Sequence, residues 1–233
     1  MNIAIILAAG MGRRMGKGKN KVFLNLRKRP IIFYTINAFE KNPKIKSIIL
    51  VTREEEITDF LNLSQKYKFK KIKTIIAGGK ERQDSAYNAL KFLEKELNQN
   101  NKSVIVFHNG ANPFVTQKEI NQSIEEAKKY GACVVAHPAK DTIKEIDSKG
   151  LVIKTLDRKK LWNMQTPQTI CFNLAIQAFS KAYKDNFLGT DDVSLVERMG
   201  KKVKIVHGSS HNFKITTPLD MELAKIIIQN YEF

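Results

Sequence analysis

The sequence predicts an α/β fold, with a mostly parallel, Rossmann-like sheet that carries helices on both faces. Apolar segments of strand length alternate along the chain with segments whose apolar residues recur at helical spacing. The connections between these segments are short, as they are in folds built from strand–helix units. Two of the strands end in glycine-bearing turns, at Gly10 and at Gly78-Gly79, and ligands in such folds bind beyond the carboxyl ends of strands.

Length and composition favour a single domain over residues 1–233. A hydrophobic content of 42% is enough for a sizeable core, and no apolar run approaches the roughly 20 residues that a membrane span requires. Met1 leads directly into a strand, so no signal peptide is expected. The two cysteines, Cys133 and Cys171, show no metal-binding spacing. We therefore expect a cytoplasmic protein without membrane contacts.

The net charge of +17 suits a protein that handles several phosphates, although a nucleic-acid binder or a lysine-rich proteome would produce the same balance. The lysines are spread along the whole chain, and the run Lys66–Lys71 has the pattern of a solvated surface. The sequence contains no zinc finger, RNP-type aromatic strand or basic zipper. We therefore do not expect nucleic acid as a partner.

The first half of the chain alternates strands and helices. Ile3–Leu7 is an apolar run of strand length, and a short apolar segment follows at Lys21–Leu26. Pro30 opens a helix whose buried face is marked by apolar residues at helical spacing. Further strands are predicted at 47–51 and 72–77, with a helix at 54–66 between them.

The middle of the chain continues the alternation. After Gly78-Gly79 a helix is predicted, and Ser85 lies near its start, where a hydroxyl either caps the helix or contacts an anion. A buried strand at 103–107 ends in the turn His108–Phe114, which we expect to face the first glycine turn. Thr116 and Glu119 form a capping box before the next helix, and a strand follows at 132–136.

The pattern changes at residues 138–160. Two extended pieces surround a Lys-Gly turn there, which predicts a β-hairpin arm that serves as a lid or a dimer contact. A helix at 173–183, a second helix capped by Asp191 and Asp192, a strand at 201–206 and an edge strand at 212–216 follow. Thr217 caps the last helix, with Pro218 at its first position.

The turn after the first strand reads Leu-Ala-Ala-Gly-Met-Gly-Arg-Arg-Met and is followed by Asn20-Lys21. Eight basic residues and no acid lie between Arg13 and Arg29, so free backbone N–H groups and cations together predict a polyphosphate site. The dinucleotide fingerprint does not fit, because Gly16 stands one place late, and the P-loop spacing is one residue short. The turn resembles instead the signature loop of nucleotidyltransferases that act on sugar or polyol phosphates.

Four further strings strengthen this resemblance: G-G-K-E-R-Q-D-S, P-A-K-D-T-I-K, L-W-N-M-Q-T-P-Q, and G-T-D-D-V-S-L-V-E with N-F-K-I-T-T-P-L-D. In this order and spacing they resemble the 2-C-methyl-D-erythritol 4-phosphate cytidylyltransferase family over essentially the whole chain. The ribitol 5-phosphate cytidylyltransferases are a close alternative, but they more often show L-A-G-G and P-K-Q in the first loop. A third alternative is a non-catalytic CTP-binding homologue.

The resemblance implies that CTP and a polyol phosphate react to release pyrophosphate, in a homodimer joined through the arm. It assigns stabilisation of the triphosphate and its transition state to Arg14, Lys21 and Lys214. It assigns contacts with the substrate phosphate to Thr142 and Arg158, and contacts on the substrate side to the position of Asn112. For CTP binding it implies Ala8, Ala9, Gly10, Gly12, Gly79, Arg82 and Ser85.

The chain departs from the family at one turn, which in the family reads H-D-[AG]-A-R-P. Here Asn109 stands in place of the aspartate that the family uses as its Mg²⁺ ligand, and Asn112 stands in place of the arginine. An amide oxygen coordinates Mg²⁺ without the charge that this hard cation prefers. We therefore expect Mg²⁺ as the cofactor with weakened protein affinity, or a changed acceptor, or lost activity.

Overall fold

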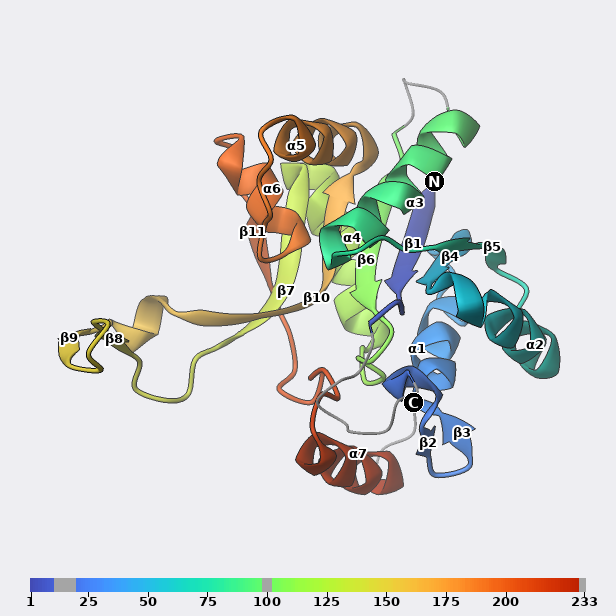
Figure 1. Cartoon of the computed structure of the whole chain (residues 1–233), viewed down its shortest axis with the longest axis horizontal. Coiled ribbons are helices and arrows are strands. Elements are labelled where there is room, and N and C mark those ends of the chain that lie inside the picture. Colours follow the sequence, from blue (N-terminus) through green and yellow to red (C-terminus); the bar gives the residue numbers. More distant parts are fainter. Residues whose placement is uncertain (11–19, 98–101, 231–233) are drawn as a thin grey trace.

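A seven-stranded sheet forms the centre of the fold, in the order β11-β7-β10-β6-β1-β4-β5 (Figure 1). The computed structural model describes residues 1–10, 20–97 and 102–230. All neighbouring strands are parallel except β10, which pairs antiparallel with both β6 and β7. The strands are β1 (Asn2–Leu7), β4 (Ser47–Thr52), β5 (Ile72–Ala77), β6 (Val104–Asn109), β7 (Ala132–Pro138), β10 (Trp162–Cys171) and β11 (Lys204–His207).

Helices cover both faces of this sheet, as the sequence predicts, because alternate residues of each buried strand point to opposite faces. Ile3 and Ile5 of β1 belong to the core cluster that includes α3, α5 and α6. Ala4 and Ile6 belong to the cluster that includes α1, α2 and α4. The helices are α1 (Ile31–Glu40), α2 (Ile57–Tyr67), α3 (Arg82–Glu96), α4 (Gln117–Tyr130), α5 (Phe172–Lys184) and α6 (Asp192–Arg198).

A smaller layer closes the fold near the C-terminus. Helix α7 (Pro218–Asn230) packs through Met221 and Ala224 against Leu26 and Ile31, where the short hairpin of β2 (Asn25–Leu26) and β3 (Arg29–Pro30) meets α1 (Figure 1). Two single 3₁₀ turns lie between these elements, η2 (Lys21–Phe23) before the hairpin and η3 (Glu54–Glu56) before α2. Within the described residues, no helix is both long and apolar enough to cross a lipid bilayer.

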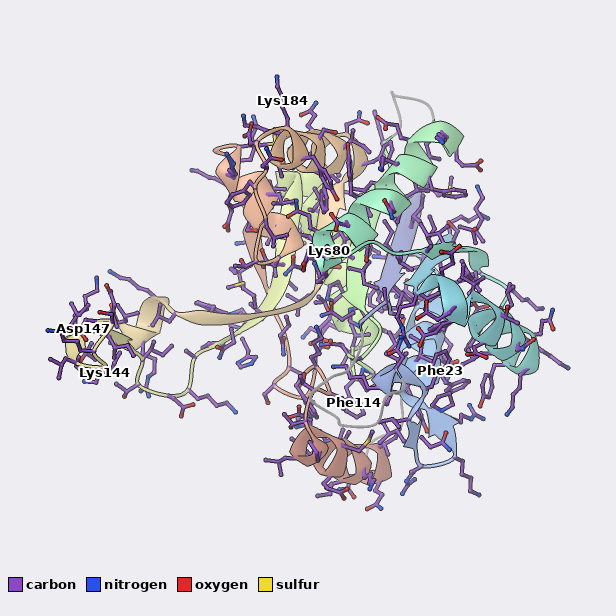
Figure 2. The ribbon with its side chains drawn as sticks, viewed as in Figure 1. Phe23, Lys80, Phe114, Lys144, Asp147 and Lys184 are labelled. Carbon is purple, nitrogen blue, oxygen red and sulfur yellow. The ribbon has the colours of Figure 1, made fainter. Side chains whose placement is uncertain are left out.

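Residues 138–160 form the expected arm. Its outer part is a hairpin of β8 (Lys144–Ile146) and β9 (Val152–Thr155), followed by the 3₁₀ turn η4 (Arg158–Lys160). Figure 2 shows Lys144 and Asp147 at its end, far from Lys80 at the main sheet. Its apolar side chains are open to solvent: Ile146, Leu151, Val152 and Ile153 are 58–64% exposed.

One predicted element is wrong. The segment 212–216 is not an edge strand but an irregular connection between β11 and α7. Its alternation of polar and apolar residues resembles a strand, yet Asn212 is fully buried and its side-chain amide donates to the carbonyl oxygen of Thr166 at 2.7 Å. The backbone N–H of Ile215 donates to the carbonyl oxygen of Ala111. These bonds hold the segment against β10 and the turn after β6 rather than in a ladder.

Candidate functional site

A cavity of about 480 Å³ lies beyond the carboxyl ends of β1, β5 and β6. Ala8, Ala9 and Gly10 line it from the end of β1, and Asn109 from the end of β6. The backbone N–H of Gly110 donates to the carbonyl oxygen of Leu7 at 2.8 Å, so the turn after β6 lies against the turn after β1. This is the edge of an open α/β sheet where ligands bind.

A second cavity of about 510 Å³ adjoins the first. Arg82, Asn109 and Lys214 line both cavities, so they lie at the boundary between two ligand-sized spaces. Amide side chains dominate the rest of the second cavity: Asn112, Asn163, Gln165, Gln168 and Asn212. Amides both donate and accept hydrogen bonds, and they therefore suit a ligand that carries hydroxyl groups.

The turn between β5 and α3 brings backbone close to the first cavity. A Cβ atom on Gly78 would lie 2.6 Å from Ser85 Oγ, and one on Gly79 would lie 2.2 Å from the Cβ of Asp84, so both positions require glycine. Ser85 Oγ accepts from the backbone N–H of Gly79 at 3.1 Å and donates to the carbonyl oxygen of Glu81. The Ser85 hydroxyl thus stabilises the turn between β5 and α3.

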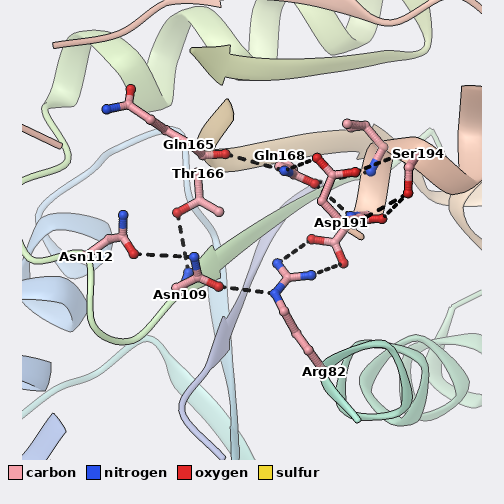
Figure 3. A network of polar contacts seen from close by, with 10 residues as sticks. Arg82, Asn109, Asn112, Gln165, Thr166, Gln168, Asp191 and Ser194 are labelled. Atoms are coloured by element: carbon pink, nitrogen blue, oxygen red, sulfur yellow. Dashed lines mark hydrogen bonds and ion pairs between the residues drawn. The ribbon is translucent and has the colours of Figure 1, made fainter. Parts of the chain in front are cut away.

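Arg82 is held in place by side chains from two other segments of the chain (Figure 3). Its guanidinium forms two bonds with the buried carboxylate of Asp192, and its Nε donates to Asn109 Oδ1 at 3.2 Å. Burial alone would lower the pKa of Arg82, but the charge and hydrogen bonds of Asp192 raise it above the ordinary value. Arg82 is therefore a permanent cation with a fixed orientation.

Only one of the two expected α6 caps is correct. Asp191 is the N-cap, because its Oδ1 accepts from the backbone N–H of Ser194 at 2.9 Å. Asp192 is instead the partner of Arg82. The backbone N–H groups of Asp192 and Val193 donate to Gln168 Oε1, so β10 supplies the remaining acceptor for the helix N-terminus.

Asn109 and Asn112 form a neutral amide pair at the boundary of the two cavities (Figure 3). Asn109 Nδ2 donates to Asn112 Oδ1 at 3.3 Å, and Asn112 Nδ2 donates to the carbonyl oxygen of Asn212 at 3.4 Å. The oxygen of Asn109 thus faces the guanidinium of Arg82, where a metal cation would be repelled. Among the described residues, no three His, Cys, Asp or Glu side chains gather in a way that would hold a metal ion. The side chains at Asn109 do not fit a protein-held Mg²⁺.

His108 lies directly behind this pair and is fully buried. Its Nε2 donates to the carbonyl oxygen of Asn112 at 3.0 Å, while its Nδ1 has no hydrogen-bond partner among the described residues. Burial, aided by the charge of Arg82, lowers the pKa of His108 to about 4, against the opposing effect of the Asn112 bond. The imidazole is therefore neutral near pH 7, and its hydrogen bond to Asn112 stabilises the turn after β6.

Two lysines reach the first cavity from distant parts of the chain. Lys21 opens the 3₁₀ turn η2 and is 8% exposed, and Lys214 lies on the irregular segment before α7. With Lys80 and Arg82, these lysines give the described lining four cationic side chains against one carboxylate, that of Glu81, so the cavity suits an anion. Arg14 and Gly12 lie outside the described residues, so their expected roles stay predictions.

Thr142 and Arg158 are not brought to either cavity in a single chain. Both are exposed and lie on the arm, where Arg158 Nη1 donates to the carbonyl oxygen of Lys140 at 2.6 Å. Neither lines a described cavity. Their expected contact with a substrate phosphate therefore stays a prediction.

Sequence reasoning assigned no role to several residues that organise the site. The side chains of Asn20, Glu56, Gln168 and Asn212 are all buried and hydrogen-bonded to segments far away in the chain. Gln168 and Asn212 lie in the strings Q-T-P-Q and N-F-K that carry the family resemblance. The presence of an uncharged polar residue in such a string is the sequence feature that points to a role in the site.

Comparisons with known proteins match nearly the whole chain. A family model described as IspD, 2-C-methyl-D-erythritol 4-phosphate cytidylyltransferase, matches residues 2–230. Proteins of that name from Bacillus cereus and Clostridioides difficile are 46% and 48% identical, and the matches cover 98% of this chain and 98% and 94% of those proteins.

Solved structures agree with these sequence matches. The 4-diphosphocytidyl-2C-methyl-D-erythritol synthase of Anaerococcus prevotii superposes with a TM-score of 0.85 at 30% identity, covering 98% of this chain and 96% of that one. The 2-C-methyl-D-erythritol 4-phosphate cytidylyltransferase of Francisella tularensis gives 0.80 at 30% identity, covering 97% and 98%. The mostly parallel α/β sheet that the sequence predicts is thus confirmed.

Proposed function

The chain belongs to the 2-C-methyl-D-erythritol 4-phosphate cytidylyltransferase family, and on that basis we propose that it joins CTP to 2-C-methyl-D-erythritol 4-phosphate with release of pyrophosphate. The observation that carries this proposal is the pair of adjoining cavities that share Arg82, Asn109 and Lys214. A cation at the boundary between two anionic substrates can lower their mutual repulsion and hold the reacting atoms together.

The reaction needs no nucleophile from the protein. An oxygen of the acceptor phosphate forms a new bond to the α-phosphorus of CTP, and the bond from that phosphorus to the bridging oxygen breaks as pyrophosphate leaves. Negative charge builds up on the α-phosphoryl oxygens in the transition state, so fixed cations beside them lower the barrier. We assign this role to Lys21 and Lys214, with Arg14 as a third cation.

We assign the nucleotide to the first cavity, where Ala8, Ala9, Gly10 and Gly79 allow close approach of backbone and Arg82 and Ser85 shape the turn. The acceptor would occupy the second cavity, whose amides suit a polyol. In the part of the chain that the structure describes, the only Lys or Arg side chains lining this cavity are Arg82, which is paired with Asp192, and Lys214.

This shortage of cations supports a homodimer. In the dimer we propose, the arm of one copy lies over the second cavity of the other and brings Thr142 and Arg158 to the acceptor phosphate. The exposed apolar residues of the arm, Ile146 and Leu151–Ile153, support such a contact, because a cluster of this kind marks an interaction surface.

Mg²⁺ remains our proposed divalent cation, but as a counter-ion of the CTP phosphates rather than as a metal held by protein carboxylates. The support is the neutral pair of Asn109 and Asn112 beside Arg82. We also propose a cytoplasmic location, which the two free cysteines, Cys133 and Cys171, support.

Pyrophosphate release tests the proposed function directly. The assay contains CTP and Mg²⁺, with 2-C-methyl-D-erythritol 4-phosphate or ribitol 5-phosphate as parallel acceptors. We expect release with the first acceptor and a rate at least about 100-fold lower with the second, because ribitol 5-phosphate has a longer chain, lacks the methyl branch and brings one more hydroxyl that the site would have to desolvate. Release with ribitol 5-phosphate alone, or with neither acceptor, would overturn the proposal.

A further inference from the structure

We propose that Asn20 and Glu56 form a clasp that sets the position of Lys21 in the first cavity, which makes both of them positioning residues for the triphosphate. The inference rests on the proposed function, since it takes CTP as the ligand of this cavity. Neither side chain lines the cavity itself. Their effect would therefore be exerted through the backbone that carries Lys21.

The side chain of Asn20 joins three segments of the fold. Asn20 is 1% exposed, and its Nδ2 donates to the carbonyl oxygen of Ala8 at 2.6 Å and to Glu56 Oε2 at 2.8 Å. Its Oδ1 accepts from the backbone N–H of Val22 at 3.3 Å. Both amide hydrogens and the carbonyl oxygen are thus used, and only an amide of this length supplies two donors and one acceptor.

Glu56 is the fixed end of the clasp. It is 5% exposed, and a buried carboxylate is costly unless donors surround it. Thr52 Oγ1 donates to its Oε2 at 3.1 Å, and Arg53 forms an ion pair with its Oε1. These contacts hold the carboxylate at the end of β4 and the start of the 3₁₀ turn η3, independently of its bond with Asn20.

The clasp connects two segments that line the first cavity, the end of β1 and the 3₁₀ turn η2. Ala8 lines the cavity on one side of the clasp, and Lys21 follows Asn20 directly on the other. Lys21 belongs to a single 3₁₀ turn whose N-cap is Asn20, so the direction of its side chain depends on that cap. A displacement of about 1 Å in a charged group of this kind can cost about 100-fold in rate.

The fold contains a matched control in Asn42, which is also fully buried. Asn42 Nδ2 donates to two oxygens, those of Gln117 and Asn121, and its Oδ1 accepts from the backbone N–H of Lys44, two residues further on. The hydrogen-bond pattern is thus the same as that of Asn20. Asn42 lines neither cavity, so its loss affects stability without affecting Lys21.

The test compares Asn20→Asp with Asn42→Asp in the full chain. Both changes replace a side-chain NH₂ group, which donates two hydrogen bonds, by a carboxylate oxygen, which can only accept. This oxygen would face two other oxygens, so both variants should unfold at a lower urea concentration than the wild type. We expect Asn20→Asp to weaken CTP binding by calorimetry and to lower kcat, each about tenfold or more, with the KM of the acceptor nearly unchanged. Asn42→Asp should leave CTP affinity within about twofold of the wild type. Equal CTP affinity in Asn20→Asp and the wild type would overturn the clasp, as would an equal loss in Asn42→Asp.

A second change separates positioning from general damage. In the double variant Asn20→Asp with Glu56→Gln, the new amide of residue 56 donates to the new carboxylate, so part of the lost CTP affinity should return. Failure of the double variant to bind CTP better than Asn20→Asp would contradict the proposal. If Asn20→Asp does not fold, Glu56→Ala alone is the test, since it removes the acceptor of Asn20, and an unchanged CTP affinity would overturn the clasp.

The wild-type chain distinguishes failure of the clasp from failure of the proposed function. Binding of inorganic tripolyphosphate but not of CTP would contradict the proposed nucleotide, and the clasp would then be judged on tripolyphosphate affinity. A wild-type chain that bound neither anion would contradict both proposals.

Discussion

Arg82 and Asp192 form an ion pair with two bonds, Nη1–Oδ1 at 2.7 Å and Nη2–Oδ2 at 2.6 Å, which joins the start of α3 to the start of α6. The paired geometry leaves the Nε of Arg82 to donate to Asn109. The orientation of Arg82 in the first cavity is therefore set jointly by β6 and α6.

Asp192→Asn should lower the free energy of unfolding by about 2 kcal/mol. Removing one partner of a buried ion pair leaves the other charge uncompensated, and the effect is reduced here because the side chain of Arg82 is 31% exposed. Urea unfolding measures the change. Asp185→Asn is the control, since its ion pairs with Lys181 and Arg198 are more exposed and should contribute less than about 1 kcal/mol. Equal effects of the two changes would contradict this account.

Lys214→Gln should lower kcat/KM by about 100-fold, because a positive charge at the boundary of the two cavities is lost. Steady-state pyrophosphate release measures this. Lys80→Gln removes a charge that lines the first cavity alone and should cost less than about threefold, since that charge does not lie where the two cavities meet. If both variants lost activity equally, total charge rather than the position of Lys214 would be responsible.

Asn109→Asp should lower the Mg²⁺ concentration needed for half-maximal CTP binding by about tenfold, because a carboxylate adds the charge that a hard cation prefers. Mn²⁺ binding, followed by electron paramagnetic resonance, gives a readout that does not depend on turnover. The control is Asn163→Asp, which adds the same charge to the second cavity alone. An unchanged Mg²⁺ requirement would show that the metal does not contact this position.

His108 should make stability depend on pH between about 4 and 6.5. The folded pKa of about 4 lies below the ordinary 6.5, so the unfolded chain takes up a proton in this window and stability falls as the pH falls. The shift corresponds to about 3 kcal/mol. In urea unfolding at several pH values, His108→Gln should lose less stability than the wild type across the window. Parallel curves for the two proteins would contradict the assignment.

Ile153→Asp should convert a dimer into a monomer, because it places a charge among the exposed apolar residues of the arm. Sedimentation velocity measures the mass, and pyrophosphate release should fall about tenfold or more if the partner's arm completes the acceptor site. Ser148→Asp, at the exposed turn of the same arm, should leave both unchanged. A wild-type chain that is active as a monomer would refute the role of the arm.

The sequence alone predicted the elements whose signals are local. Apolar runs marked the strands β1, β4, β5, β6 and β7, and the capping box of Thr116 and Glu119 marked the start of α4. The arm was recognisable from two extended pieces around Gly150. Each of these signals lies within a few neighbouring residues, where backbone conformation depends on the residues themselves.

Only the tertiary structure decided which distant groups meet. It placed β10 antiparallel between β6 and β7, paired Arg82 with Asp192, joined Asn20 to Glu56, and held 212–216 outside the sheet. The periodicity of apolar residues indicates which face of a helix or strand is buried. It does not indicate which other element packs against that face. A buried polar side chain must find a partner wherever the packing brings one close, and for Asp192 and Asn212 that partner lies far away in the sequence.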